Sequence, residues 1–166
     1  MNEILTTILK DTFSLTQFKT RVRLLKSNLL KAFFGSNAQN EDKSEGLPAA
    51  TQDLNWLKSL PENFYQKFNK DNVYNIFSSL EKLSANLPIL TIYLTFEPDD
   101  ITLNQIGTFT RQTFNSSSLL LGIKIDPNLI AGTALVWKGV YRDYSLRAKL
   151  EEKKAEISEE FKKFLR

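Results

Sequence analysis

Adjacent carboxylates are residues whose type could support general acid–base chemistry, and they occur at Asp99-Asp100, Glu151-Glu152 and Glu159-Glu160. A pair that works on one substrate must direct both groups at the same reacting atoms. Neighbours on one helix face are three or four residues apart, so adjacent side chains diverge. These pairs are therefore more typical of a solvated surface than of a catalytic site.

Histidine and cysteine are both absent from the 166 residues. Without histidine, the usual general base of a serine hydrolase and the commonest metal ligand are missing. Without cysteine, the chain has no disulfide, no thiolate metal site and no cysteine nucleophile. The six glycines are scattered, so no glycine-rich loop is present to hold a phosphate. The sequence therefore predicts a non-catalytic protein with no cofactor and no bound metal.

Composition indicates a folded protein, because 42% of the residues are hydrophobic and 25% are charged. No apolar run approaches the roughly 20 residues that a membrane span requires. Glu3 stands where a secretion signal would carry a basic residue. We expect neither a transmembrane segment nor a secretion signal. The net charge of +3 would indicate nucleic acid only if the charge were concentrated in one place.

The charge is concentrated in residues 14–34, which contain five basic residues and no acidic residue. Within the first segment, 1–34, the apolar spacing predicts an amphipathic helix that runs through Asp11 or breaks there, with Ser14 as a new cap. We expect its apolar seam to dock a partner helix with an acidic surface. The residues of this seam are Leu15, Phe18, Val22, Leu25 and Leu29. Contact with nucleic acid or anionic lipid is the less favoured use of the same helix.

The remaining chain divides into three segments. Residues 35–47 are polar and glycine-bounded, which predicts a flexible linker. Residues 48–88 predict short helices, and residues 89–166 predict an α/β domain with a terminal helix. The tail from Glu151 balances five acidic against five basic residues, as on a solvated helix face. The predicted fold class is α+β: amino-terminal helices, then a small mixed β-sheet with one crossover helix, then a long carboxyl-terminal helix.

Within residues 89–166, alternating apolar residues predict a first strand near 89–96, and the crossover helix near 102–114 leads to a second strand. Two further short strands join across Lys138-Gly139, where glycine suits a tight hairpin. Between the second strand and this hairpin lies an Asp126-Pro127 turn, in which proline restricts both residues. A well-made turn without any function explains this stretch equally well on physical grounds.

Two motifs stand in residues 90–150. The turn motif consists of Asp126, Pro127, Leu129, Ile130 and Gly132, and the helix-start motif consists of Asp143, Ser145, Arg147 and Leu150. On these motifs, residues 90–150 resemble the carboxyl-terminal part of the delta subunit of F-type ATP synthases, called the oligomycin-sensitivity-conferring protein in mitochondria. That family has a Val-Asp-Pro-Ser-Leu-Ile-Gly-Gly turn and an Asp-Gly-Ser-x-Arg-x-x-Leu start to its last helix. Ala131 and Tyr144 replace glycines of the family pattern.

The resemblance implies a non-catalytic subunit of the peripheral stalk. Such a subunit joins the amino-terminal helices of the alpha subunits in the catalytic head to the b subunits, and so resists rotation of the head. In this protein the last helix and the sheet would bind the b subunits. The implied location is the cytoplasmic face of a bacterial plasma membrane, peripheral through the ATP synthase complex. The family usually begins with a six-helix bundle, whereas residues 1–87 are shorter and show no match that can be aligned.

Three alternatives remain open from the sequence. A scaffold subunit of another rotary ATPase, or an unrelated scaffold, keeps the protein-binding role and changes the complex. A small basic RNA-binding α/β module changes the class of partner and predicts affinity that falls steeply with salt. An enzyme is the least favoured reading, because no group of residues supports catalysis.

Overall fold

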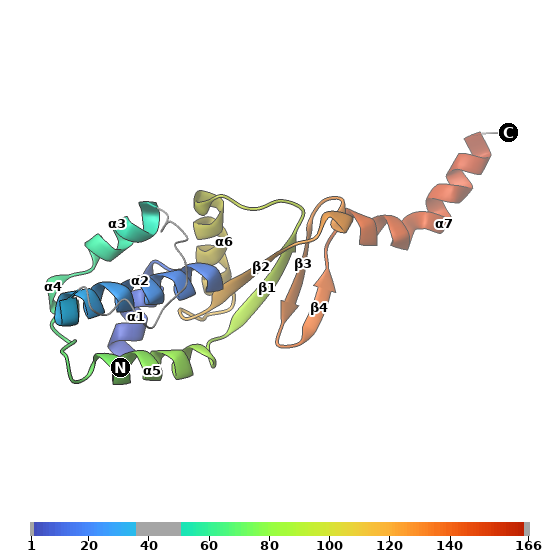
Figure 1. Ribbon diagram of the computed structural model, residues 1–166. Helices are drawn as coiled ribbons and strands as arrows, with labels where there is room; N and C mark the ends of the chain where they lie inside the picture. The colour runs from blue at the N-terminus through green and yellow to red at the C-terminus, as the bar shows by residue number, and fades with distance from the viewer. Residues whose placement is uncertain (1, 36–50, 165–166) are drawn as a thin grey trace.

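The computed structural model describes residues 2–35 and 51–164. Within these residues the chain forms seven α-helices and one four-stranded mixed sheet, which confirms the predicted α+β class (Figure 1). The expected linker at 35–47 lies, apart from Gly35, outside the described residues. The elements are α1 (Asn2–Lys10), α2 (Leu15–Phe34), α3 (Thr51–Ser59), α4 (Glu62–Tyr65), α5 (Val73–Ser84), β1 (Ile89–Leu94), α6 (Asp100–Thr113), β2 (Leu120–Ile125), η2 (Pro127–Leu129), β3 (Thr133–Trp137), β4 (Val140–Asp143) and α7 (Leu146–Phe164).

The break between α1 and α2 is made by a capping box. The Ser14 hydroxyl accepts a hydrogen bond from the Gln17 backbone N–H at 3.1 Å, and the Gln17 side chain accepts one from the Ser14 N–H at 3.3 Å. Each side chain therefore satisfies a backbone donor that the helix start leaves without a partner. Of the two possibilities open from the sequence, a continuous helix and a break capped by Ser14, the structure has the second.

Helices α1 to α5 share one hydrophobic core, so these five helices form a single helical lobe. Aromatic rings pack at its centre, where Phe64, Phe68 and Phe77 form a chain of contacts with ring centroids 5.5 and 6.0 Å apart. The buried hydrophobic members are Ile4, Ile8, Leu9, Phe18, Leu25, Leu29, Trp56, Leu57, Leu60, Phe64, Phe68, Val73, Phe77, Leu80 and Leu120. Leu120 comes from β2, so the helical lobe packs directly on the sheet.

A buried arginine of α2, Arg21, connects α2 to α3 and to the turn that follows α1. The Arg21 guanidinium forms an ion pair with Asp53 of α3 at 3.0 Å and donates to the Thr12 hydroxyl at 2.9 Å. It also donates to the Asp11 carbonyl and lies 5.0 Å from the centre of the Trp56 ring. Arg21 and Asp53 are both buried, and a buried charge is tolerated when it is paired and hydrogen-bonded in this way.

The sheet has the strand order β2-β1-β3-β4. β1 and β2 are parallel and joined by α6, whereas β3 pairs with β1 and with β4 in antiparallel fashion. Lys138 and Gly139 both have positive φ, 49° and 80°, which is the conformation of a two-residue hairpin turn and confirms the predicted hairpin. The core between the sheet and α6 is built on Leu90, Ile92 and Leu94 of β1.

Arg111 of α6 joins the α/β part of the chain to the helical lobe. It donates hydrogen bonds to the carbonyls of Leu9 at 2.9 Å, Thr12 at 2.6 Å and Leu119 at 3.0 Å. Its guanidinium also lies 4.6 Å from the centre of the Phe13 ring. The same ring packs on α6 at Gly107, where an added Cβ would come within 2.3 Å of it. Gly107 is therefore a close-approach site between the two parts of the chain.

Candidate docking surface at the start of the last helix

The Asp-Pro turn ends β2 through hydrogen bonds of its own residues. The Asp126 carboxylate accepts a hydrogen bond from the Asn128 N–H at 3.0 Å, and the Asp126 N–H donates to the carbonyl of Leu94 in β1 at 2.8 Å. Pro127 begins the 3₁₀ turn η2, where its lack of an N–H costs nothing. Leu129 closes the turn and is fully buried. The turn motif is thus anchored to the sheet at one end and to the core at the other.

Ile130 has an unusual backbone conformation. Its φ is 66° and its ψ is −57°, and the Ala131 N–H donates to the Leu129 carbonyl at 2.7 Å. This is a γ-turn, a strained conformation that is rare for a β-branched residue. The Ile130 side chain is 62% exposed, in contrast to its buried neighbour Leu129. An apolar side chain is therefore held in solvent at a conformational cost.

Gly132 brings the turn motif and the helix-start motif together. Its φ is 89°, and an added Cβ would lie 2.7 Å from the carbonyl oxygen of Tyr144. The Leu146 N–H donates to the Ala131 carbonyl at 2.8 Å across the same junction. The turn motif and the helix-start motif are separate in the sequence, and the structure places them in direct contact.

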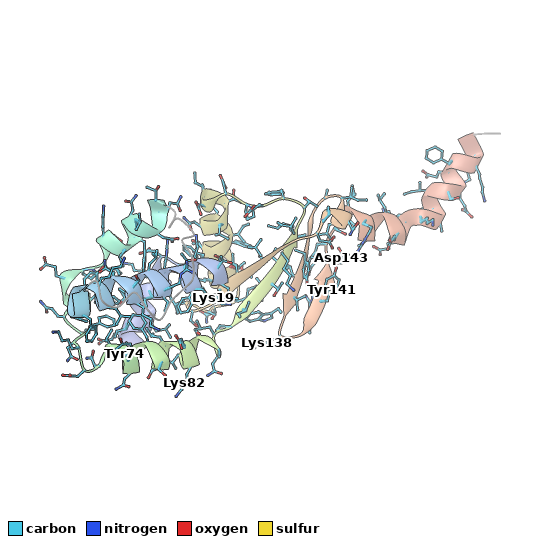
Figure 2. The ribbon with its side chains drawn as sticks, viewed as in Figure 1. Lys19, Tyr74, Lys82, Lys138, Tyr141 and Asp143 are labelled. Carbon is cyan, nitrogen blue, oxygen red and sulfur yellow. The ribbon has the colours of Figure 1, made fainter. Side chains whose placement is uncertain are left out.

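The helix-start motif forms a capped first turn for α7. The Asp143 carboxylate accepts a hydrogen bond from the Ser145 N–H at 2.8 Å, and the buried Ser145 hydroxyl accepts one from the Ala148 N–H at 3.3 Å. Tyr141 donates to Asp143 at 3.3 Å, and both residues are labelled in Figure 2. Arg147 forms an ion pair with Asp143 at 3.5 Å. The hydrogen bonds from Ser145, then that from Tyr141 and the charge of Arg147, hold the pKa of Asp143 below its ordinary value.

Beyond this junction α7 extends away from the sheet and from the other helices (Figure 1). Its apolar residues Leu146, Leu150, Ile157 and Phe161 are all exposed, from 38% to 67%. Spacings of four, seven and four residues place them on one narrow stripe, which is called the α7 stripe below. Such a stripe is the seam of a paired helix, and here it has no partner among the described residues.

A groove of about 440 Å³ opens where the turn motif meets the α7 stripe. Its lining residues are Ile130, Arg147, Leu150, Glu151, Lys154, Ile157 and Ser158. Three motif residues, Ile130, Arg147 and Leu150, thus share one surface feature. The groove and the α7 stripe together form the candidate docking surface.

The docking role predicted for the seam of α2 is wrong. Phe18, Leu25 and Leu29 are buried in the core of the helical lobe, and Leu15 and Val22 pack against that core. These side chains contact the other helices of the lobe, so they are not available to a partner. The heptad spacing correctly indicated that this face is buried, but spacing carries no information about whether the neighbouring helix belongs to the same chain.

A different face of α2 remains exposed or half-buried and carries Lys19, Arg23 and Lys26 at spacings of four and three residues (Lys19 is labelled in Figure 2). Among the described residues, none of the three forms an ion pair. Like charges three and four residues apart repel one another, so this face would be stabilised by an anionic surface.

The α7 stripe is not among the surfaces predicted from the sequence. The balanced charges of the tail from Glu151 predict a solvated helix face. Ile157 and Phe161 nevertheless continue the spacing of Leu146 and Leu150. That periodicity was the signal that could have identified the stripe.

Among residues 2–35 and 51–164, no group of acidic residues comes together in a way that could hold a metal ion. In the same part of the chain, no helix is long and apolar enough to cross a membrane. Comparison with models of known protein families and with curated proteins finds no match to this sequence.

Proposed function

We propose that this chain is a non-catalytic subunit of the peripheral stalk of a proton-translocating F-type ATP synthase, at the cytoplasmic face of a bacterial plasma membrane. The observation that carries the proposal is the junction of the two motifs. The turn motif and the helix-start motif meet at Gly132 and Tyr144, and together they hold the start of α7. The apolar stripe of α7 has no partner among the described residues. A subunit that links two larger components needs such a surface.

In this proposal the α7 stripe and its groove bind the helices of the b subunits. The helical lobe α1 to α5 takes the place of the longer amino-terminal bundle of the family and faces the amino-terminal helices of the alpha subunits. The shared core of these five helices supports this assignment, because a reduced bundle must still bury its own apolar seams.

The connection between the two parts of the chain also fits a component that must resist twisting. Arg111 bonds to carbonyls on both sides of the connection, and the Phe13 ring sits directly on Gly107. Close packing of this kind permits little relative motion, because rigid side chains and backbone would have to separate before the parts could rotate.

The proposal is tested by isolating the tagged protein from native membranes at moderate salt and identifying the co-purified proteins by mass spectrometry. The wild-type chain is expected to recover the alpha, beta and b subunits. A Leu150→Asp, Ile157→Asp variant is expected to lose the b subunits, since two charges would then be buried in the contact. Ala155→Asp adds a charge to the opposite face of the same helix and should leave recovery unchanged. Recovery of no ATP synthase subunit by the wild-type chain would refute the proposal.

One observation favours a second candidate, a small basic RNA-binding module. Lys19, Arg23 and Lys26 form an unpaired cationic face on α2, as judged from the described residues. RNA bound through this face would dissociate steeply with rising salt, because each phosphate contact releases a counterion. The same purification separates the candidates. Recovery of RNA without ATP synthase subunits favours the module, and recovery of subunits of another rotary ATPase would move the stalk role to that complex.

A further inference from the structure

The loop between η2 and β3 keeps isoleucine where glycine would fit with less strain. Ile130 adopts φ 66° and ψ −57°, a region that β-branched residues avoid. Two residues later Gly132 adopts positive φ with no side chain to obstruct it. A loop that only had to turn the chain gains nothing from the isoleucine, since the side chain adds strain and is left in solvent. Strain kept at a surface position indicates a role for the side chain.

The strained conformation places the Ile130 side chain beside two residues of the α7 stripe. Ile130, Leu150 and Ile157 line the same groove, although they come from two elements 20 residues or more apart in the sequence. The loop residue thus widens a stripe that α7 alone would present as a narrow seam. From Leu146 to Phe161 the stripe spans about 22 Å along the helix axis. A surface of this length and width fits another helix.

Charges beside the stripe indicate the chemistry of that helix. Lys149, Lys153 and Lys154 border the first half of the stripe and outnumber Glu151, which also lines the groove. Among the described residues none of the three lysines forms an ion pair. An approaching helix gains most if it carries acidic residues there, because opposite charges attract across the rim of an interface and opposite potentials speed association.

We propose that Ile130 is a strain-held anchor that packs against an amphipathic stalk helix with acidic residues facing Lys149, Lys153 and Lys154. The inference rests on the proposed function for the identity of that helix. At Ile130 the strained backbone lowers the folding stability of the chain, and the exposed side chain strengthens binding. The same residue therefore has opposite effects on folding and on docking.

Two substitutions at this position distinguish the effect of the side chain on binding from the effect of backbone strain on folding. Ile130→Ala removes most of the side chain and keeps a Cβ in the strained conformation, whereas Ile130→Gly removes both the side chain and the strain. Glycine normally lowers stability relative to alanine through the entropy of the unfolded chain. Here we expect the reverse, with the glycine variant melting about 2 to 4 °C above the alanine variant. Ala131→Gly, at a neighbouring residue without positive φ, should show the normal order and melt below the wild type.

Binding is measured with the purified cytoplasmic domain of the b subunit as the probe. Both Ile130 variants are expected to bind about tenfold or more weakly than the wild type, because a buried isoleucine contributes on that order to an interface. Wild-type affinity in the glycine variant would overturn the anchor, and a glycine variant that melts below the alanine variant would overturn the strain. If the wild-type chain itself does not bind the probe, the proposed function fails and the anchor with it, whereas the order of melting temperatures still tests the strain separately.

Discussion

Arg111→Ala should loosen the connection between the helical lobe and the sheet. In the native chain the guanidinium bonds to the carbonyls of Leu9, Thr12 and Leu119 at 2.6 to 3.0 Å and lies over the Phe13 ring. Alanine removes all of these interactions at once. Burial lowers the pKa of Arg111 from its very high ordinary value, but a guanidinium stays charged at neutral pH.

The expected loss in the free energy of unfolding depends on how many hydrogen bonds are removed and on how exposed they are. A hydrogen bond to a charged group contributes about 1.5 to 3 kcal/mol, and the lower value applies because the site is only partly buried. Three such bonds would sum to about 4.5 kcal/mol. In the variant, water forms hydrogen bonds with the freed carbonyls and so recovers part of this free energy. We expect a loss of about 2 to 3 kcal/mol in the free energy of unfolding.

The assay is urea unfolding followed by far-ultraviolet circular dichroism, with hydrogen exchange of the amides around the α1–α2 turn. Arg111→Ala should lower the unfolding midpoint and speed exchange at Phe13 and at Leu121, whose N–H donates to the Phe13 carbonyl at 2.8 Å. Arg111→Lys keeps the charge without the planar fork and should recover only part of the loss. Gln112→Ala changes an exposed neighbour on the same helix and should shift the free energy of unfolding by less than about 0.5 kcal/mol.

The reasoning is wrong if Arg111→Ala unfolds within about 0.5 kcal/mol of the wild type, because that is the range of surface substitutions without special contacts. A large loss of stability together with unchanged exchange at Phe13 would also contradict it. In that case the arginine would stabilise α6 alone and would not join the two parts of the chain.

In thermal melting, Gly132→Ala should lower the free energy of unfolding by about 2 kcal/mol or more, because both its positive φ and the nearby Tyr144 carbonyl oppose a Cβ. Gly139→Ala should lower it by only about 1 kcal/mol, because its φ is also positive but its Cβ would meet no atom within 4 Å. Equal losses would contradict the close contact at Gly132. The pKa of Asp143 is depressed in the folded chain, so its contribution should be present above its ordinary value near 3.8 and be lost as the pH falls through the lower folded value. Denaturation followed by circular dichroism at several pH values should show a smaller acid loss of stability in Asp143→Asn than in the wild type, because Glu3 and Asp99, whose pKa values are also lowered, keep their own contributions in both; identical acid profiles would refute the role of Asp143. Leu25→Ala should cost about 2 to 5 kcal/mol by chemical denaturation, because this side chain is fully buried. Leu150→Ala, at an exposed position, should change the free energy of unfolding by less than about 0.5 kcal/mol. A larger loss for Leu150→Ala than for Leu25→Ala would indicate that the seam of α2 is the external surface.

Local features of the fold were predictable because each depends on residues close together in the chain. The Ser14 capping box, the Lys138-Gly139 hairpin and the Asp126-Pro127 turn all form from side chains and backbone within a few residues. Alternation in β1 and the crossover helix likewise indicated the strand pattern and the α+β class. The first strand ends at Leu94, two residues before its predicted limit, where pairing with β2 and β3 stops.

The long-range contacts were not predictable from spacing. Periodicity along α2 showed that Leu25 must be buried, and only packing by the other helices of the lobe decided that it is buried within the same chain. Ile157 is the opposite case: its sequence neighbours are charged, and the structure shows that it belongs to an apolar stripe with no partner among residues 2–35 and 51–164.

By itself the sequence determined the elements, their caps and turns, and the absence of histidine and cysteine chemistry, because these depend on residue identity and near neighbours. The tertiary structure alone decided which faces are free. It brought Gly132 against Tyr144, forced Ile130 into a strained and exposed position, and set Arg111 against carbonyls about 100 residues away in sequence. Hydrophobic burial has no direction, so a sequence shows that a face needs a partner, whereas packing decides whether the chain supplies that partner itself.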